Sequence, residues 1–142
     1  MKKLLATLVL FLTAFSAISN AQVLDEVTLA KRAARRNLTI KEWNTDPKTK
    51  TRTLDNVVTY DDQGRKVEEI EYNVYGMKWR EVYEYGANGR IVKDVRYNEK
   101  GKPTIVRKYE YNADGTKKKQ YNYGPDGRLQ HVKVFEYIIP DE

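Results

Sequence analysis

Carboxylates placed in pairs are the residues of this chain whose types and spacing could support catalysis. Glu68 and Glu69 are adjacent, and Glu81 lies close before Glu84. Two carboxylates flanking a glycosidic bond are the machinery of glycoside hydrolysis. In an extended strand, however, neither pair shares a parity, so the two members point to opposite faces. Neither pair can then converge on one substrate, so we expect no catalytic residues and no enzyme activity.

Histidine and cysteine add few further options. The chain has one histidine, His131, and no cysteine, which excludes thiolate zinc sites and cysteine nucleophiles. We interpret His131, which shares its parity with Leu129 and Phe135, as a partly packed or edge residue. The turns carry one or two acids, where a calcium loop needs about four oxygen side chains. The sequence therefore predicts no metal and no other cofactor.

Aromatic side chains are the more distinctive feature, since the chain contains 11 tyrosines and two tryptophans. An exposed row of flat rings could stack on sugar rings or receive a peptide. The alternative is that most of the rings form the core beneath the N-terminal segment, because aromatics dominate the buried area of small cores. The candidate binding face comprises Trp79, Tyr83, Tyr85, Tyr97, Tyr109, Tyr111, Tyr121 and Tyr123.

A repeat must position these rings. Tyrosine, three turn-forming residues and glycine recur six times, and the glycines are nearly evenly spaced, at Gly64, Gly76, Gly89, Gly101, Gly115 and Gly127. Each unit is typical of a type I turn closed by a left-handed glycine with a bulge. Turns this short make neighbouring strands antiparallel. We predict a mainly β fold: a meander of about seven strands from about Leu54 to Ile139, or eight with an N-terminal strand.

Side-chain alternation between the turns predicts two chemically different faces. Met77, Trp79, Tyr83 and Tyr85 share one parity, and the aromatic residues of later strands are expected beside them. The opposite parity is polar. We place on that polar face Lys78, Arg80, Glu84, Asp94, Arg96, Lys108, Glu110, Lys118 and Gln120.

The first residues have the layout of a secretory signal peptide, residues 1–21. Lys2 and Lys3 precede the apolar stretch Leu4–Ile18, and small residues at Ser19 and Ala21 suit cleavage before Gln22. The alternative, a transmembrane anchor, would need a longer apolar stretch with positive flanks. No cysteine lies near Ala21, which excludes a lipoprotein anchor. We expect an exported protein, periplasmic or extracellular, without a membrane anchor.

Residues 22–53 lack the repeat and precede the repeat domain, residues 54–142. Residues 23–37 carry acids early, arginines late and apolar residues that approximate one helical face. We predict a short helix over the aromatic face, the alternative being a disordered basic leader. Leu38 to Trp43 resembles an extra strand, and Asn44 to Pro47 a turn.

The mature chain is expected to be mildly basic, and its basic clusters, such as Lys117 to Lys119, would suggest nucleic acid in a cytosolic protein. The formal net charge of +6 falls to +4 without residues 1–21, which contain two lysines and no acid. Charges of both signs are interleaved, as on a surface that keeps a protein dissolved. The export signal argues against nucleic acid as a partner, and anionic lipid headgroups or acidic glycans are the open alternatives for weak binding.

The repeat resembles the bacterial YD (RHS-type) repeat. Tyr60 to Arg65 looks like its opening, and Gly89-Arg90-Ile91 and Gly127-Arg128-Leu129 look like its continuation. The rhythm is also similar to MORN-variant repeats and to short secreted bacterial proteins of unknown function. Over about residues 54–137 the resemblance implies β-hairpins outside the cytoplasm that act as scaffold, without catalytic residues. Six turns cannot form the toxin-enclosing shell of large YD-repeat proteins.

Two functions from different classes follow. The first is a protein-interaction or structural module of the cell envelope, with an unknown protein as partner. The second is a glycan-binding module that uses exposed tyrosines and Trp79 on a cell-surface glycan. Free sheet edges also allow strand addition by a partner or by a second copy, as in an edge-strand homodimer.

Overall fold

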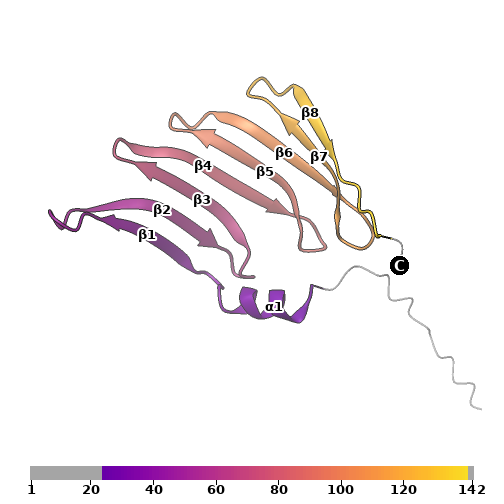
Figure 1. Cartoon of the computed structure of the whole chain (residues 1–142), viewed down its shortest axis with the longest axis horizontal. Helices are drawn as coiled ribbons and strands as arrows, with labels where there is room; N and C mark the ends of the chain where they lie inside the picture. The colour runs from indigo at the N-terminus through magenta and orange to yellow at the C-terminus, as the bar shows by residue number, and fades with distance from the viewer. Residues whose placement is uncertain (1–23, 141–142) are drawn as a thin grey trace, which may run out of the picture.

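The computed structural model describes residues 24–140, which form one open antiparallel sheet beside a short helix (Figure 1). The strands lie in the order in which they occur in the chain, so the predicted meander is confirmed. The predicted signal peptide lies outside the described residues. The elements are α1 (Glu26–Ala33), β1 (Thr39–Thr45), β2 (Arg52–Tyr60), β3 (Lys66–Asn73), β4 (Gly76–Tyr85), β5 (Ile91–Asn98), β6 (Pro103–Tyr111), β7 (Lys117–Tyr123) and β8 (Leu129–Val134).

Glycine closes most turns as the repeat predicts. At the turn between β4 and β5, Gly89 has a φ of +74° and its amide donates to the carbonyl of Gly86 at 2.9 Å. A residue with a side chain rarely adopts this backbone conformation. The turn between β3 and β4 differs, because only Val74 and Tyr75 separate the paired residues Asn73 and Gly76. That shorter loop projects two exposed apolar side chains into solvent.

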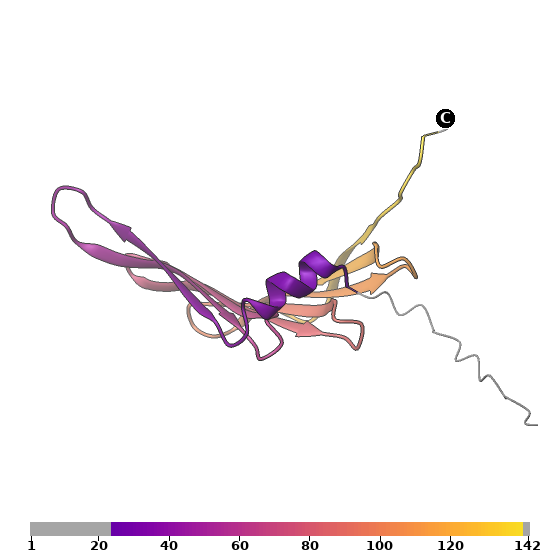
Figure 2. The ribbon, with the colours of Figure 1, turned by 90° about the horizontal axis from the view of Figure 1, so that it is seen from below.

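The sheet is a single layer, as the rotated view in Figure 2 shows. Val95, 9% exposed, is the one buried hydrophobic residue among residues 24–140. The other buried side chains are polar: Glu81, Asp94, Gln120 and Asn122. A layer this thin cannot rely on a hydrophobic core. Its stability must come from backbone pairing and from side chains that contact each other across neighbouring strands.

Helix α1 forms where the charge order predicts it, between the acidic first turn at Glu26 and the basic last turn at Lys31 and Arg32. The Asp25 side chain caps it by accepting from the amide of Thr28 at 2.8 Å. The helix lies along the turn ends of the strands (Figure 1) and buries none of its own residues. The helix does not lie over the aromatic face as expected: it meets the sheet only at the turn ends, so the middle of each face stays uncovered.

The remainder of the N-terminal segment joins the sheet. Strand β1 begins one residue later than the expected strand, at Thr39, and it pairs with β2 from Thr39↔Thr59 to Thr45↔Arg52. The turn begins slightly later than the sequence suggests, because the amide of Asp46 donates to Thr51. Every residue of β1 is exposed. The sheet therefore begins with an open edge at β1 and ends with another at β8.

Candidate functional site

Strand register defines the two faces of the sheet. On one face, here called the ionic face, Glu81 lies opposite Arg96 and Asp94 lies opposite Arg107. On the other, the valine face, Val82 lies opposite Val95 and Val95 lies opposite Val106. Residues directly opposite each other in antiparallel strands point to the same side.

The eight aromatic residues of the predicted binding face do not share one face, so the expectation of a single aromatic face was wrong, while their role in binding stays a prediction. Tyr97, Tyr121 and Tyr123 project from the valine face, where Lys108 pairs with Tyr121 and Val106 with Tyr123. All eight rings are half-buried. The ionic face carries the other five rings, those of Trp79, Tyr83, Tyr85, Tyr109 and Tyr111.

The predicted polar face was wrong for the same reason, because residues of equal parity on different strands do not share a face. Asp94 and Arg96 were expected on the opposite side from the rings, but they lie on the ionic face among five of them. Each face therefore mixes aromatic and charged side chains, and neither is a purely polar or purely aromatic surface.

Bulges explain this misplacement. Every strand pair contains a register shift, and from β2 onward it lies near one end, as between Glu84 and Tyr85, where Glu84 pairs with Lys93 and Tyr85 with Ile91. A bulge adds one residue to one strand, so the in-and-out alternation shifts by one there. Tyrosines that precede turns at the α1 end, such as Tyr85, therefore face the opposite side from those at the far end, such as Tyr97.

A buried ion cluster occupies the centre of the ionic face. The Arg96 guanidinium donates to the Glu81 carboxylate at 2.5 and 2.9 Å. Arg107 bridges two carboxylates, at 2.6 Å from Glu81 and 2.7 Å from Asp94. The Tyr109 hydroxyl donates to Asp94 at 2.5 Å. The side chains of Glu81 and Asp94 are only 5% and 3% exposed. Their carboxylate oxygens accept hydrogen bonds from side chains of neighbouring strands.

The environment shifts the two buried carboxyls in opposite directions. Burial by itself raises the pKa of Glu81, but the hydrogen bonds and charges of Arg96 and Arg107 outweigh it and lower that pKa. Burial raises the pKa of Asp94, although the hydrogen bond from Tyr109 and the charge of Arg107 oppose it. A catalytic acid must reach its substrate. These groups instead bind each other, which suits a structural role.

The cluster extends toward β3 through Glu69. Its carboxylate accepts from the Lys66 ammonium at 2.8 Å, from Asn56 at 3.3 Å and from the Tyr83 hydroxyl at 3.3 Å. Burial and the nearby charge of Glu81 raise the pKa of Tyr83 to about 12. Glu68 points to the other face and pairs with Arg80. The expected separation of Glu68 and Glu69 is thus confirmed.

Sequence reasoning did not foresee the ion cluster, yet its spacing is visible in the chain. One constant interval, the length of a strand plus a turn, separates Glu81 from Asp94 and Asp94 from Arg107. Such an interval places the residues side by side on consecutive strands of a meander. Charged residues that recur at this interval were the signal: Glu81, Asp94 and Arg107 of the cluster, followed by the neutral Gln120 and then by Lys133.

Cations lie over seven of the eight candidate rings. On the ionic face, Arg96 lies 4.3 Å from the Trp79 ring centroid and Lys66 lies 4.7 Å from that of Tyr83. The other five rings so covered are Tyr85, Tyr97, Tyr109, Tyr111 and Tyr123. Such contacts stabilise the sheet by about 0.5–1 kcal/mol each at exposed sites. They also cover the ring surfaces on which a sugar would stack.

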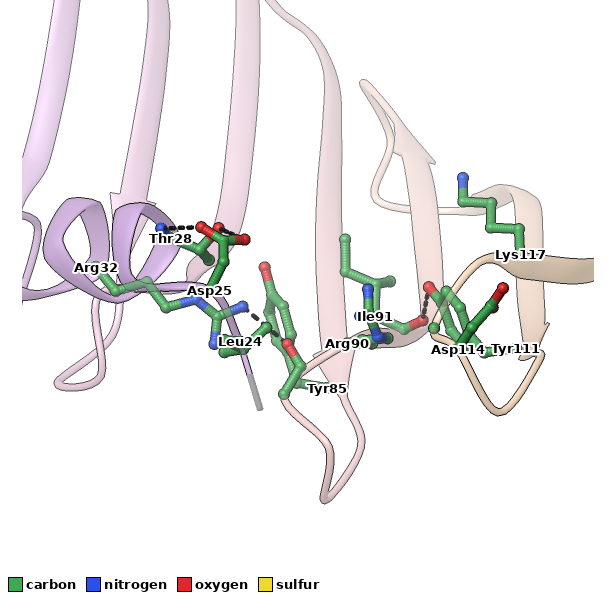
Figure 3. A pocket seen from close by; sticks show the side chains of 12 residues that line it. Leu24, Asp25, Thr28, Arg32, Tyr85, Arg90, Ile91, Tyr111, Asp114 and Lys117 are labelled. Atoms are coloured by element: carbon green, nitrogen blue, oxygen red, sulfur yellow. Dashed lines mark hydrogen bonds between the residues drawn. The ribbon is translucent and has the colours of Figure 1, made fainter. Parts of the chain in front are cut away.

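A groove of about 690 Å³ lies between α1 and two neighbouring turns (Figure 3). Arg32 crosses it and donates to the Gly89 carbonyl at 2.8 Å. Asp25 and Asp114 also line the groove, and both accept hydrogen bonds from nearby threonines. Its aromatic and basic lining consists of Tyr85, Tyr111, Arg32, Arg90 and Lys117.

His131 lies on β8 beside buried polar neighbours. It is exposed, and its Nε2 lies 2.5 Å from the Asn122 amide nitrogen, which itself belongs to a buried side chain. Within residues 24–140, no group of three or more acids or histidines is placed to hold a metal. No helix in that part of the chain is long and apolar enough to cross a membrane.

The edge strand β8 ends the sheet with apolar side chains exposed. Leu129 and Val134 are 51% and 63% exposed, and Val132 is 39% exposed. Beyond β8 the chain still follows β7, because the Phe135 amide donates to the Lys118 carbonyl at 3.2 Å. Backbone groups alternate sides along an antiparallel strand. The amides of Val132 and Val134 therefore point away from β7, toward the outer side of the sheet.

Comparison with known proteins adds little. No protein-family model and no curated protein matches this chain. A similar solved structure is that of an S. aureus TarM mutant in complex with Fondaparinux, alpha-GlcNAc-glycerol and UDP. The TM-score is 0.33 at 18% identity, covering 74% of this chain and 23% of that chain. A likeness at this level carries no argument, and the resemblance to YD repeats rests on the repeat residues alone.

Proposed function

We propose that this chain is an exported, non-enzymatic interaction or structural module of the cell envelope that takes a protein partner at an open sheet edge. The observation that carries the proposal is the unpaired outer edge of strand β8. This strand ends the sheet with its outer amides directed away from β7 and with Val132 and Val134 exposed. Exposed strand edges bind extended segments of other proteins through main-chain hydrogen bonds.

The ionic face supports the non-enzymatic part of the proposal. Its most buried carboxylates, Glu81 and Asp94, bind Arg96, Arg107 and Tyr109 at hydrogen-bonding distance. An active site needs an acid, base or nucleophile within reach of a substrate. The groups of this cluster serve one another across β4, β5 and β6, which is the pattern of a cross-strand tie.

A proline substitution tests the edge. Proline removes the backbone donor, and it is tolerated in an edge strand where the amide points outward. We expect Val134→Pro to leave the sheet folded and to abolish capture of a specific protein from envelope and medium extracts of the host. Val134→Thr keeps the amide and serves as the matched control. Equal retention by the two variants would refute strand addition at β8.

Cell fractionation tests export. We expect the protein outside the cytoplasm with an N-terminus at Gln22. Full-length protein confined to the cytoplasm, with Met1 retained, would contradict the envelope role. This measurement does not depend on which partner binds, so it separates location from interaction.

A glycan-binding function remains the alternative, and the groove is the feature that favours it. Lys117 and Arg32 border it together with Tyr85 and Tyr111, a lining suited to an acidic sugar. Titration with uronic-acid and neutral oligosaccharides, followed by NMR on the amides of Gly89 and Gly115, would test it. We expect no shifts, because cations already cover the tyrosine rings. Saturable shifts with the acidic sugar alone would favour the glycan function instead.

A further inference from the structure

We propose that the partner at the β8 edge is a second copy of this chain, whose β1 pairs with β8 in a head-to-tail arrangement. This inference rests on the proposed function and names its partner. Strand number is the first argument. In an eight-stranded meander β1 and β8 run in opposite directions, so β1 of a second copy can continue the sheet as a ninth antiparallel strand with its faces in register.

The repeat supplies the second argument, because Tyr137 occupies the same position in its hairpin as Tyr111 does in the one before. The Tyr111 hydroxyl donates to the Ile91 carbonyl at 2.6 Å, and the chain then turns into β7. One hairpin further along, Tyr137 donates in the same way to Lys117 at 2.9 Å. Tyr137 thus occupies the position that precedes a turn, yet no further strand follows it among the described residues. Among the described residues, the outer side of β8 therefore carries no paired strand.

The repeat also defines the register that this strand would adopt. Strand β6 pairs with β7 through Val106↔Tyr123, Arg107↔Asn122 and Tyr109↔Gln120. One hairpin further along, at the interval that separates Tyr111 from Tyr137, the residues equivalent to Val106, Arg107 and Tyr109 are Val132, Lys133 and Phe135. A register shift precedes Tyr123 on β7, and an equivalent one precedes Trp43 on β1. Aligning the two shifts makes Trp43, Glu42 and Ile40 the equivalents of Tyr123, Asn122 and Gln120.

The resulting pairs are chemically complementary. Lys133 would lie opposite Glu42 of the second copy, an ion pair. Phe135 would lie opposite Ile40, and Val132 opposite Trp43, both apolar pairs. Ile40 and Trp43 are 39% and 42% exposed in the chain by itself. Opposite charges and aromatic–aliphatic pairs are the cross-strand combinations that stabilise sheets.

Backbone polarity agrees with this register. The Leu38 carbonyl accepts from Tyr60 on β2, so Leu38 and Ile40 pair inward. By alternation the amides of Lys41 and Trp43 point outward. On β8 the outward amides are those of Val132 and Val134, and the register sets Val132 opposite Trp43 and Val134 opposite Lys41. The outward backbone groups of β8 therefore lie opposite the outward backbone groups of β1, where they can form hydrogen bonds.

The geometry of the edges keeps this contact accessible. Helix α1 lies beneath the strands that follow β1 (Figure 1), with Arg32 bound to Gly89 in the turn after β4. It leaves the outer side of β1 free. Because the contact joins two different edges, each added copy presents the same pair of edges again. Heterologous contacts of this kind build rings or open chains rather than two-fold dimers.

Charge exchange at one pair tests the proposal. Sedimentation velocity of the purified mature chain, residues 22–142, should show oligomers larger than dimers that grow with concentration. Glu42→Lys and Lys133→Glu should each weaken association, on the order of fivefold for a cross-strand charge pair. The double variant, and an equimolar mixture of the two single variants, should recover it. Weakening without recovery would overturn the register.

Disulfide trapping gives a second readout, since the chain has no cysteine of its own. Under oxidation, the double variant Glu42→Cys, Lys133→Cys should form a ladder of covalent oligomers, and each single variant should not. Directly opposed Cα atoms about 4.5 Å apart suit a disulfide. A covalent dimer from Lys133→Cys alone would indicate a symmetric β8 contact and overturn the head-to-tail arrangement.

The outcomes separate this inference from the proposed function. A monomer at every concentration that still captures an envelope protein, with capture lost in Val134→Pro, refutes self-association and supports strand addition by another protein. Oligomers that Val134→Pro dissolves support both. A monomer that captures nothing refutes both.

Discussion

The Tyr111 hydroxyl donates a 2.6 Å hydrogen bond to the carbonyl of Ile91, at the opposite end of the β5–β6 hairpin from its turn. Tyr85 makes the same contact with Lys66 at 2.8 Å across β3 and β4. The bond therefore ties the open ends of one hairpin, and the structural unit is a pair of strands. The six Tyr-x3-Gly units of the sequence thus correspond to fewer, larger repeats, each one hairpin long.

This tie predicts a measurable loss in Tyr111→Phe. Removing the hydroxyl leaves the Ile91 carbonyl without its partner while the ring stays in place. We expect the free energy of unfolding in urea to fall by about 1 kcal/mol. Tyr121→Phe is the matched control, because that hydroxyl bonds to the exposed Glu110 carboxylate, and its effect should be much smaller. Equal losses of unfolding free energy in the two variants would show that the hydrogen bond from Tyr111 to Ile91 stabilises the fold no more than an exposed one.

The ion cluster predicts a larger loss in Arg107→Met. This change leaves the Glu81 and Asp94 carboxylates, 5% and 3% exposed, without the cation that bridges them. Breaking a buried pair in this way costs about 3 kcal/mol. Lys78→Met removes a cation, 54% exposed, from its pair with Glu71, and should cost under about 1 kcal/mol. Similar costs for both would mean that water screens the cluster as well as the surface pair.

Acid should destabilise the fold, with opposite contributions from the two buried carboxyls. The pKa of Glu81 is lowered from its ordinary 4.5, so its contribution is present above that pH and lost as pH falls through the lowered value. The pKa of Asp94 is raised from 3.8, so its contribution is present below that pH and lost as pH rises through the raised value. Several other acids, such as Glu69 and Asp61, have a lowered pKa like that of Glu81. Their combined effect exceeds that of Asp94, so the net result is lower stability in acid.

Urea unfolding from about pH 7 to about pH 3 checks these signs. Wild-type stability should decrease toward acid. Glu81→Gln should flatten the decrease, and Asp94→Asn should steepen it. A flatter curve in both variants would mean that the pKa of Asp94 is lowered in the folded state.

The meander could be predicted because turn chemistry is local. A glycine in the left-handed conformation, as at Gly127 with a φ of +76°, is set by residues next to it. Short turns then determine strand order and direction. The strands β2 to β8 therefore agree with the seven predicted from the repeat.

The faces could not be predicted because they depend on bulges, and a bulge is visible only when two strands are paired. A shift of one residue turns every following side chain to the other side. Tyr97 and Tyr123 were misplaced for this reason. The cations over the rings were missed as well, since contacts such as Arg80 over Tyr97 join residues on neighbouring strands. Counting in steps of one strand plus one turn would have aligned Glu81 with Asp94.

Helix α1 should be held by its contact with one turn glycine, and Gly64→Ala tests this. A Cβ at Gly64 would lie 1.7 Å from the Arg32 carbonyl oxygen, so the helix must move away. Gly101 provides the matched control, because its φ of +73° is close to the +70° of Gly64 and nothing lies within 4 Å of its Cβ position. Both variants incur the cost of a left-handed backbone, about 1–2 kcal/mol.

Only Gly64→Ala should also release the helix. An isolated segment as short as α1 does not stay helical in water, so its loss is detectable. We expect fast hydrogen exchange at the amides of Leu29 and Ala30 in Gly64→Ala and protection unchanged in Gly101→Ala. Arg32→Ala, which removes the bond to Gly89 without straining a turn, should give an intermediate result. Protected α1 amides in Gly64→Ala would mean that capping by Asp25 suffices to hold the helix without the turn.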